Sequence, residues 1–309
     1  MLKKYLGKIK ILKHAPKNKY FGVPEIILSC FLSSIIITLV RDLSSQFHIF
    51  FIVMMRNLCG IFVLIPHFIK HQKSLFRTNN IHLHLFRSFN GTISMFLWFY
   101  AIISLPMSEA ISLSFLTPII TTLASKFFLK ERVSKNIFFA CLVSFVGVLI
   151  IMRPGFNEFK YGYIFCFGSI ISWTISNLTV KTMTKTDKTR NIVAQMTVFM
   201  FLFSLPFAIP HFKFIDFNAF VKFLFLGITS NLCYKLIAQA YRKNNLSLLQ
   251  PFDFSRLIFT SFIAYFIFDE KPDFWIFLGS SIILIGLILS LKNKNFESEK
   301  SLAQKATEI

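Results

Sequence analysis

Acidic residues are scarce in this chain, which holds 14 Asp and Glu against 34 Lys and Arg. All charged residues together reach only 16%, whereas a soluble domain carries about a quarter. The polar residues are too few to coat a soluble fold of this length. A net charge of +20 would suggest nucleic acid in a soluble protein. Here the basic residues lie mostly between apolar blocks, which indicates anionic lipid and no nucleic acid as the partner.

Motifs that bind metals, nucleotides or reacting carbonyl groups are also missing. The five cysteines fall inside apolar blocks and form no CxxC pair, so the sequence indicates neither a metal site nor a disulfide framework. It contains no HExxH, no GxSxG and no P-loop. We therefore expect no cofactor and no direct use of ATP. An intramembrane enzyme and an ion channel stay open as alternatives of other classes.

Long apolar blocks make up most of the chain, which is 54% hydrophobic and holds 41 Phe. Each block is long enough to cross a hydrocarbon core about 30 Å thick. Every span should be a helix, because backbone polar groups in lipid must pair within their own segment. The sequence therefore predicts an all-α membrane protein with ten transmembrane helices. They run roughly over 21–40, 47–69, 85–105, 108–128, 136–152, 161–180, 191–210, 218–241, 246–268 and 274–291.

Basic residues are distributed unevenly between the two sets of connections. With the N-terminus placed in the cytoplasm, the inside segments hold 24 of the 34 Lys and Arg and the outside segments hold six. Positive charge favours the cytoplasmic side of a membrane protein. We therefore expect both termini to be cytoplasmic, with basic tails over 1–20 and 292–309.

The chain also contains a weak internal repeat. Residues 105–150 overlay 244–289 when shifted by 139 positions, which brings Glu131 onto Glu270 and Gly147 onto Gly286. Five spans per half is an odd number, so the halves, 21–152 and 161–291, must have opposite orientations. Two inverted five-helix repeats are typical of secondary transporters, whose substrate site lies between the halves near the bilayer midplane.

The stretch "RSFNGTISMFLWFYAIISLPMSEAISLSFLTPIITTLASKFFLKERVSKNIFFACLVSFVGVLIIMRPG" (87–155) and the later copy "SLLQPFDFSRLIFTSFIAYFIFDEKP" resemble a known family. They are similar to the EamA group of the drug/metabolite transporter superfamily, including Pro118 of its fourth span and the turn residue Glu131. Arg56 in "VMMRNLCG" stands where this family often has an arginine. The second copy departs from the first, with Arg256 where the first has Thr117. The resemblance implies a secondary transporter of small metabolites with a central cavity.

Charged residues inside the predicted spans are the first candidates for a substrate site, because a lone charge at mid-span costs about 3 kcal/mol on insertion scales. Asp253 and Arg256 lie three residues apart, so they share a helix face and can pair. Arg56 lies near the centre of its span. Lys235 either lines the cavity or extends to the inner surface. Arg87, within a turn of that surface, reads as an interface anchor.

Neutral polar and aromatic residues complete the candidate set. Several recur at helical spacing and share a face with a charged or amide residue. These are Asn90 and Trp98 on the third span, Trp173 and Asn177 on the sixth, and Asn231 and Tyr234 beside Lys235 on the eighth. A pair formed by Asp253 and Arg256 that only fixes helix packing is the structural alternative.

The functional hypothesis is a secondary transporter that moves a small polar metabolite across a bacterial inner membrane by alternating access. A cavity with more arginines than carboxylates would bind a carboxylate or phosphate, with Asp253 engaging an amine or carrying a coupling proton. The excess of Phe, Ile, Lys and Asn suggests an AT-rich genome, typical of small intracellular bacteria that import metabolites. We therefore expect uptake, with S-adenosylmethionine as the single substrate candidate. Export of amino acids or other metabolites is the alternative, and a homodimer stays open.

Overall fold

The computed structural model describes residues 22–75, 80–105, 107–114, 116–131, 135–152 and 161–268, with four two-residue pieces between 274 and 286. Over these residues the chain forms helices and short connections and no strand. The predicted tails 1–20 and 292–309, Glu270 and most of the predicted span 274–291 lie outside the described residues. The all-helical prediction is confirmed for the part of the chain that the structure describes.

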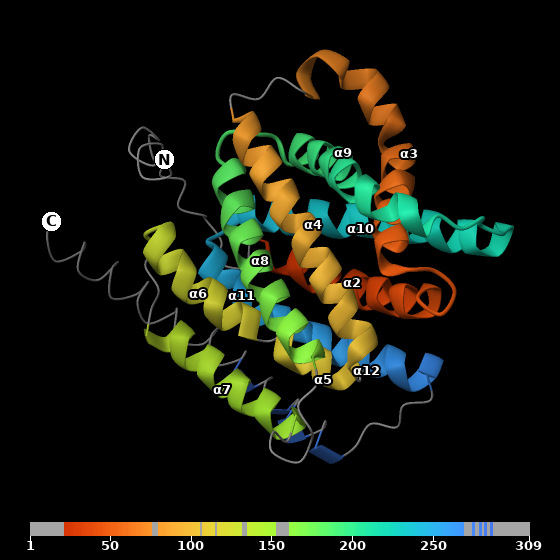
Figure 1. Ribbon diagram of the computed structural model, residues 1–309. Coiled ribbons are helices and arrows are strands. Elements are labelled where there is room, and N and C mark those ends of the chain that lie inside the picture. Colours follow the sequence, from red (N-terminus) through yellow and green to blue (C-terminus); the bar gives the residue numbers. More distant parts are fainter. Residues whose placement is uncertain are drawn as a thin grey trace, which may run out of the picture.

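The helices form one bundle, in which segments from both halves of the chain alternate (Figure 1). The first half contributes α2 (Val23–Leu43), α3 (Ile49–Leu75), α4 (Ile81–Ser104), α5 (Met107–Ser114), α6 (Leu116–Phe128) and α7 (Lys135–Met152). The second half contributes α8 (Gly162–Met183), α9 (Thr189–Ala208), the short 3₁₀ helix η1 (Ile209–His211), α10 (Phe217–Lys243), α11 (Leu246–Asp253) and α12 (Ser255–Phe268).

The packing between helices repeats when the two halves are exchanged. In chain order α2, α3 and α4 correspond to α8, α9 and α10. The helix α4 packs along α8, and its counterpart α10 packs along α2. The pair α6 and α8 is matched by α12 and α2, and α3 packs against its own counterpart α9. The bundle therefore has the two-repeat architecture that the offset of 139 residues predicts.

Individual hydrogen bonds repeat at the same offset. The hydroxyl of Thr121 bonds that of Thr174 at 3.2 Å, and the hydroxyl of Thr260 bonds that of Ser34 at 2.8 Å. These positions differ by 139 and 140 residues. Both bonds join a helix of one half to a helix of the other, so the repeat extends to the contacts that hold the halves together. The same offsets relate the bonds from Ser94 to the carbonyl oxygen of Ser169 (3.1 Å) and from Cys233 to that of Ser29 (3.5 Å).

Helices α2 and α10 run antiparallel and are held at both ends by ion pairs. Glu25, in the first turn of α2, pairs with Lys243 at the end of α10. Asp42, near the end of α2, lies 2.6 Å from Lys222 near the start of α10. Each pair therefore marks one end of the bundle. The connections predicted to be cytoplasmic lie at the end that carries Lys243.

One of the expected continuous helices is broken. The predicted span 246–268 consists of α11 and α12, which meet at Phe254. The predicted span 108–128 contains α5 and α6, and the position between them lies outside the described residues. Pro251 has no backbone N–H for the carbonyl of Ser247. Beyond Pro251 the backbone forms a tighter turn, in which the N–H of Leu257 donates to the carbonyl of Phe254 three residues earlier, at 3.1 Å. The break falls three residues after Pro251 and puts Arg256 in the first turn of α12.

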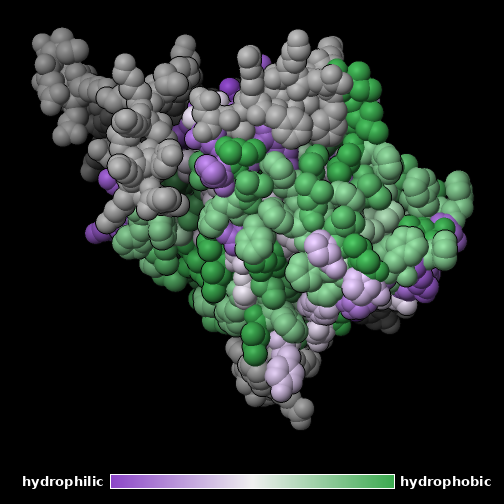
Figure 2. Space-filling view, turned by 45° about the horizontal axis from the view of Figure 1, so that its top comes forward, coloured by the Kyte–Doolittle hydropathy of each residue, from purple (hydrophilic) through white to green (hydrophobic). Residues whose placement is uncertain are grey.

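The outer surface of the bundle is apolar, as Figure 2 shows for one face. Large side chains such as Phe62, Phe89 and Phe262 are more than half exposed. Exposed apolar area on this scale fits lipid contact. Five described helices are long and apolar enough to cross a membrane: α2, α8, α10, the first 18 residues of α3, and α9 with η1. The total of ten spans stays a prediction.

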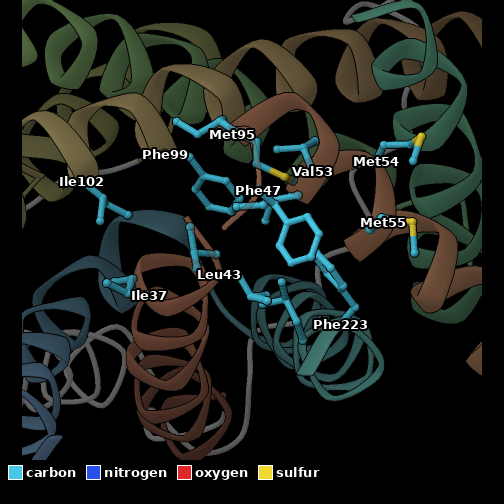
Figure 3. Close-up of a cluster of buried hydrophobic side chains, with 14 of the residues drawn as sticks. Ile37, Leu43, Phe47, Val53, Met54, Met55, Met95, Phe99, Ile102 and Phe223 are labelled. Carbon is cyan, nitrogen blue, oxygen red and sulfur yellow. The ribbon is translucent and has the colours of Figure 1, made fainter. Parts of the chain in front are cut away.

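A buried apolar cluster joins several helices of the bundle, and Figure 3 shows part of it. Phe47, in the turn between α2 and α3, meets the ring of Phe223 edge-on with centroids 5.3 Å apart. Met95 and Phe99 extend the cluster from α4. Because these side chains come from four helices, the cluster fixes how α2, α3, α4 and α10 approach one another.

The closest approach of α3 to α10 depends on Gly227. A Cβ atom at this position would lie 2.7 Å from the backbone nitrogen of Gly60 and 2.9 Å from the carbonyl carbon of Cys59. Backbone atoms cannot move aside. We expect Gly227→Ala to lower the free energy of unfolding by about 1–3 kcal/mol, measured as thermal unfolding of the purified protein. Gly168→Ala is the control, since its Cβ meets only the flexible side chain of Leu97. Equal melting temperatures for the two variants would contradict this account.

Candidate functional site

A cavity lies in the middle of the bundle, between the two halves. Its volume is about 110 Å³, which is room for several water molecules. The described residues that line it come from α2, α3, α4, α5, α6, α8, α10 and α12. They are Ser33, Ile36, Ile37, Arg56, Gly91, Ser94, Met95, Trp98, Phe99, Ser114, Thr117, Ser169, Ile170, Trp173, Cys233, Tyr234, Ile237 and Arg256.

Arg56 enters the cavity from α3 and is held by neutral groups. Its side chain is 4% exposed. Its Nε donates to the hydroxyl of Ser230 at 2.7 Å, and one terminal nitrogen lies 3.3 Å from the amide oxygen of Asn57 and 3.1 Å from the sulfur of Met95. Among the described residues none of its partners is a carboxylate. A buried guanidinium held in this way keeps its positive charge available to a ligand.

Arg256 enters from the first turn of α12, where it is fixed by Asp253. One guanidinium nitrogen lies 3.3 Å from a carboxylate oxygen of Asp253, and the same nitrogen donates to the hydroxyl of Ser114 at 3.1 Å. The pair expected from their spacing is therefore present. Asp253 does not line the cavity, and no Asp or Glu is among the described lining residues. The guanidinium thus faces the cavity, while its counter-charge lies behind it.

Aromatic side chains form the remaining walls. The rings of Trp173 and Tyr234 lie 6.0 Å apart at 43°, and Trp98 lines the cavity from α4. The guanidinium of Arg56 lies over the ring of Tyr234, with its carbon 5.2 Å from the ring centroid. This distance is within the range of a cation–π interaction. The site therefore combines fixed positive charge with flat apolar surfaces, which suits a ligand with an anionic group and an aromatic ring.

The structure brings together half of the residues that the sequence singled out. Arg56, Trp98, Trp173, Tyr234 and Arg256 line one cavity, while Asp253 holds one of them from outside it. The other candidates lie elsewhere. Asn177 belongs to a smaller neighbouring pocket, whereas Asn90 and Lys235 are half-buried side chains outside the described lining of either pocket.

Asn231 is committed to the contact between helices. Its amide nitrogen donates to the carbonyl of Gly60 at 2.8 Å, and its amide oxygen accepts from the hydroxyl of Thr197 at 2.9 Å. It therefore ties α10 to α3 and α9. The expectation that Asn231, Tyr234 and Lys235 share one face holds only loosely, because the three side chains reach different surroundings.

Sequence reasoning missed Arg87, which the nearby helix end made look like an interface anchor. Its side chain is 4% exposed, and its guanidinium carbon lies 5.3 Å from the centroid of the Tyr234 ring. Burial follows from a contact one turn earlier, where His84 lies 2.9 Å from Asp187 in the turn between α8 and α9. No local sequence pattern predicts the contact between His84 and Asp187, because the two residues are 103 positions apart.

A second polar cluster closes the end of the bundle that carries Lys243. The carboxylate of Glu131 accepts from the backbone N–H groups of Leu246 and Ser247, both at 3.1 Å, and so caps α11. Lys181 donates to the carbonyl of Asn244 at 2.5 Å. The turn glutamate of the first half thus holds a helix of the second half.

Removing the cap of α11 should destabilise this end of the bundle. We expect Glu131→Ala to lower the free energy of unfolding by about 1–2 kcal/mol. Two N–H groups lose their hydrogen-bond acceptor, and the N-terminus of α11 loses a favourable negative charge. Glu131→Gln keeps one acceptor oxygen and should lose less. Thermal unfolding of the two variants beside the unmodified protein measures the difference. An unchanged melting temperature for Glu131→Ala would contradict the capping role.

A metal or reactive centre has little support in this arrangement. Among the described residues, no three His, Cys, Asp or Glu side chains cluster closely enough to hold a metal ion. The five cysteines are free and buried. The chemistry that the cavity offers is therefore recognition of a solute by charge, hydrogen bonds and aromatic faces.

Comparison with known proteins places this geometry in a family. The model of the EamA-like transporter family matches residues 20–153 and again residues 160–292. The chain belongs to the EamA-like transporter family. The two matches coincide closely with the halves inferred from the internal repeat, and they make the chain a multi-pass membrane transporter of small metabolites. An enzyme, which the sequence alone left open, is thereby set aside.

Proteins similar to this chain are named for different substrates. The chain is 27% identical over 233 residues to a riboflavin transporter of Vibrio cholerae, covering 74% of this chain and 78% of the relative. It is 23% identical over 273 residues to an S-adenosylmethionine uptake transporter of Rickettsia bellii, covering 88% and 94%. It is 22% identical over 280 residues to a pseudopaline exporter of Pseudomonas aeruginosa, covering 88% and 96%.

A solved crystal structure has the same fold. It superimposes with a TM-score of 0.72 at 16% identity, covering 87% of this chain and 96% of the other. An identity this low shows only that the two chains share a fold. The shared fold extends over almost the whole of both chains.

Proposed function

We propose that this EamA-like transporter has ten transmembrane helices in two inverted five-helix repeats, 21–152 and 161–291, and works by alternating access to the central cavity. The repeated packing of α2, α3 and α4 by α8, α9 and α10 supports the repeats. The excess of basic residues in one set of connections supports cytoplasmic termini in a bacterial inner membrane. Rocking of one half against the other would expose the cavity to each side in turn.

The substrate carries an anionic group, in this proposal a carboxylate or phosphate bound between Arg56 and Arg256. The observation that carries this inference is the charge of the cavity. Its described lining holds two guanidiniums and no acidic side chain. Planar guanidinium groups bind carboxylates and phosphates through paired hydrogen bonds. A ligand of that class supplies the counter-charge that the lining lacks.

S-adenosylmethionine fits the arrangement as a single substrate candidate. Its carboxylate would bind between Arg56 and Arg256. Its sulfonium charge, which a cationic cavity would repel, is accommodated if it lies against an aromatic face such as that of Trp173 or Trp98. The Rickettsia bellii relative is named for uptake of this compound. We therefore propose uptake over export, although one relative is named as an exporter.

Riboflavin is the second candidate, because a cavity walled by Trp98, Trp173 and Tyr234 also suits a flat ring system. Riboflavin has no carboxylate, so its binding would not depend on both arginines. The two candidates therefore differ in what they require of Arg56 and Arg256.

The proposal is tested with the purified chain in proteoliposomes. Thermal-shift screening against a metabolite panel that contains both compounds should show stabilisation by S-adenosylmethionine. Uptake of the labelled compound should saturate and should be inhibited by the unlabelled compound but not by riboflavin. Inhibition by riboflavin but not by unlabelled S-adenosylmethionine would favour riboflavin as the substrate. Uptake that rises linearly with concentration would indicate a channel.

A further inference from the structure

A second, smaller pocket adjoins the central cavity and contains a buried cation with no assigned role. Its volume is about 10 Å³, room for about one water molecule in this conformation, and it shares Trp173, Tyr234 and Ile237 with the central cavity. Arg87 and Asn177 line it in addition. Because the two pockets have three walls in common, a small movement of these side chains would join them.

The pocket is displaced from the cavity in one direction along two helices. On α4, Arg87 lies one turn before Gly91, which lines the central cavity. On α8, Asn177 lies one turn after Trp173. Since α4 and α8 run antiparallel, both displacements lead towards the end of the bundle where His84 meets Asp187. This is the end predicted to be cytoplasmic.

The positive charge of Arg87 is not balanced by a carboxylate in the described part of the chain. Its side chain is 4% exposed, and its Nε has no hydrogen-bond partner among the described residues. Its guanidinium contacts the sulfur of Met200 at 3.8 Å and the ring of Tyr234. Asp187, in the turn at this end of the bundle, is bound to His84. A buried charge is normally paired, so its missing partner is supplied by a ligand.

The two arginines lie around a single ring. The guanidinium carbons of Arg56 and Arg87 are 5.2 Å and 5.3 Å from the centroid of Tyr234. An anionic group held by Arg56 in the central cavity would therefore meet Arg87 on passing the same ring.

We propose that Arg87, Asn177 and Tyr234 form a second anion-binding position on the cytoplasmic side of the central cavity. This position receives the carboxylate or phosphate of the substrate as it leaves Arg56. The inference rests on the proposed alternating access, but it adds an ordered transfer between two sites. Arg87 therefore governs the rate at which the substrate passes to the cytoplasmic side. Arg56 governs the affinity with which the central cavity binds the substrate.

The first experiment needs no knowledge of the substrate. Asn177→Cys provides a thiol in the pocket, and its modification is followed with an anionic and a cationic methanethiosulfonate reagent. The unmodified chain, whose five cysteines are buried, gives the background rate. Adding Arg87→Gln should lower the ratio of anionic to cationic rates at least about tenfold. Arg87→Lys should retain the ratio, and so should the exposed control Arg190→Gln. An unchanged ratio in Arg87→Gln, or no modification by either reagent, would overturn the proposal.

The second experiment uses S-adenosylmethionine as the probe. Arg87→Gln should lower the maximal rate of uptake at least tenfold and change the equilibrium dissociation constant less than threefold. Uptake at the unmodified rate, or an equal loss of binding and rate, would overturn the transfer role. If the unmodified protein takes up no S-adenosylmethionine, the proposed substrate fails, while the labelling ratio still decides whether the pocket binds anions.

Discussion

Arg56→Gln is expected to weaken binding of S-adenosylmethionine at least about 30-fold and to reduce its uptake to background. The guanidinium is 4% exposed and its described partners are neutral, so a bound carboxylate would be its counter-charge. Truncating one member of a buried, hydrogen-bonded charge pair costs about 2–5 kcal/mol. Gln is shorter, but its amide nitrogen takes roughly the place of the arginine Nε and keeps a hydrogen-bond donor for Ser230. Binding is measured by titration of the purified variant, and uptake in proteoliposomes.

Two controls separate a loss of recognition from a loss of structure. Arg56→Lys keeps the charge but not the paired donors, so it should retain part of the affinity. Arg190→Gln removes an exposed arginine at the start of α9 and should leave binding unchanged. An Arg56→Gln variant that melts normally and still binds with unmodified affinity would refute the role of Arg56.

The second large effect concerns Asp253 and Arg256, which are 3.3 Å apart. Arg256→Glu should abolish uptake, because it puts two carboxylates side by side and repels the anionic group of the substrate. The double variant Asp253→Asn with Arg256→Gln removes both charges at once. Replacing both members of a pair together is often tolerated by the fold. We expect this double variant to melt close to the unmodified protein but to lose uptake at least about tenfold, as for a lost charged hydrogen bond.

The double variant distinguishes the two interpretations of this pair. If Asp253 and Arg256 only fix the packing of α12, the neutral pair should transport at nearly the unmodified rate. If Arg256 binds substrate, the neutral pair should fold normally but transport poorly. Thermal unfolding and initial uptake rates measured on the same preparation decide between these outcomes. Near-normal uptake by the neutral pair would leave Arg56 without its proposed partner in binding.

The fold was largely predictable from the sequence, because membrane insertion leaves a strong pattern. Continuous apolar blocks require helices, and the offset between Glu131 and Glu270 gave the two halves that the family match also finds. The break within 246–268 was harder to predict. Pro251 marks a weakness in the helix, but the neighbouring helices decide where the chain tightens, and this happened at Phe254.

The candidate site was predictable only where charge alone indicates burial. Arg56 and Arg256 lie deep in their spans, so lipid exposure could be ruled out from position. Asn231 and Arg87 depend on tertiary contacts instead. The amide of Asn231 is occupied by Gly60 and Thr197, whereas Arg87 is buried by a turn about a hundred residues away. Helical spacing identifies which residues share a face, but it does not identify what that face meets.

The carboxylate requirement of uptake tests the central claim most directly. Unlabelled S-adenosylmethionine and its decarboxylated derivative, which keeps the sulfonium and the adenine, are compared as inhibitors of labelled S-adenosylmethionine uptake into proteoliposomes. The account predicts saturable uptake that the parent compound inhibits at least about 30-fold more strongly than the derivative, since only the parent can bind between Arg56 and Arg256. Equal inhibition by both compounds would contradict recognition of an anionic group by the cationic cavity.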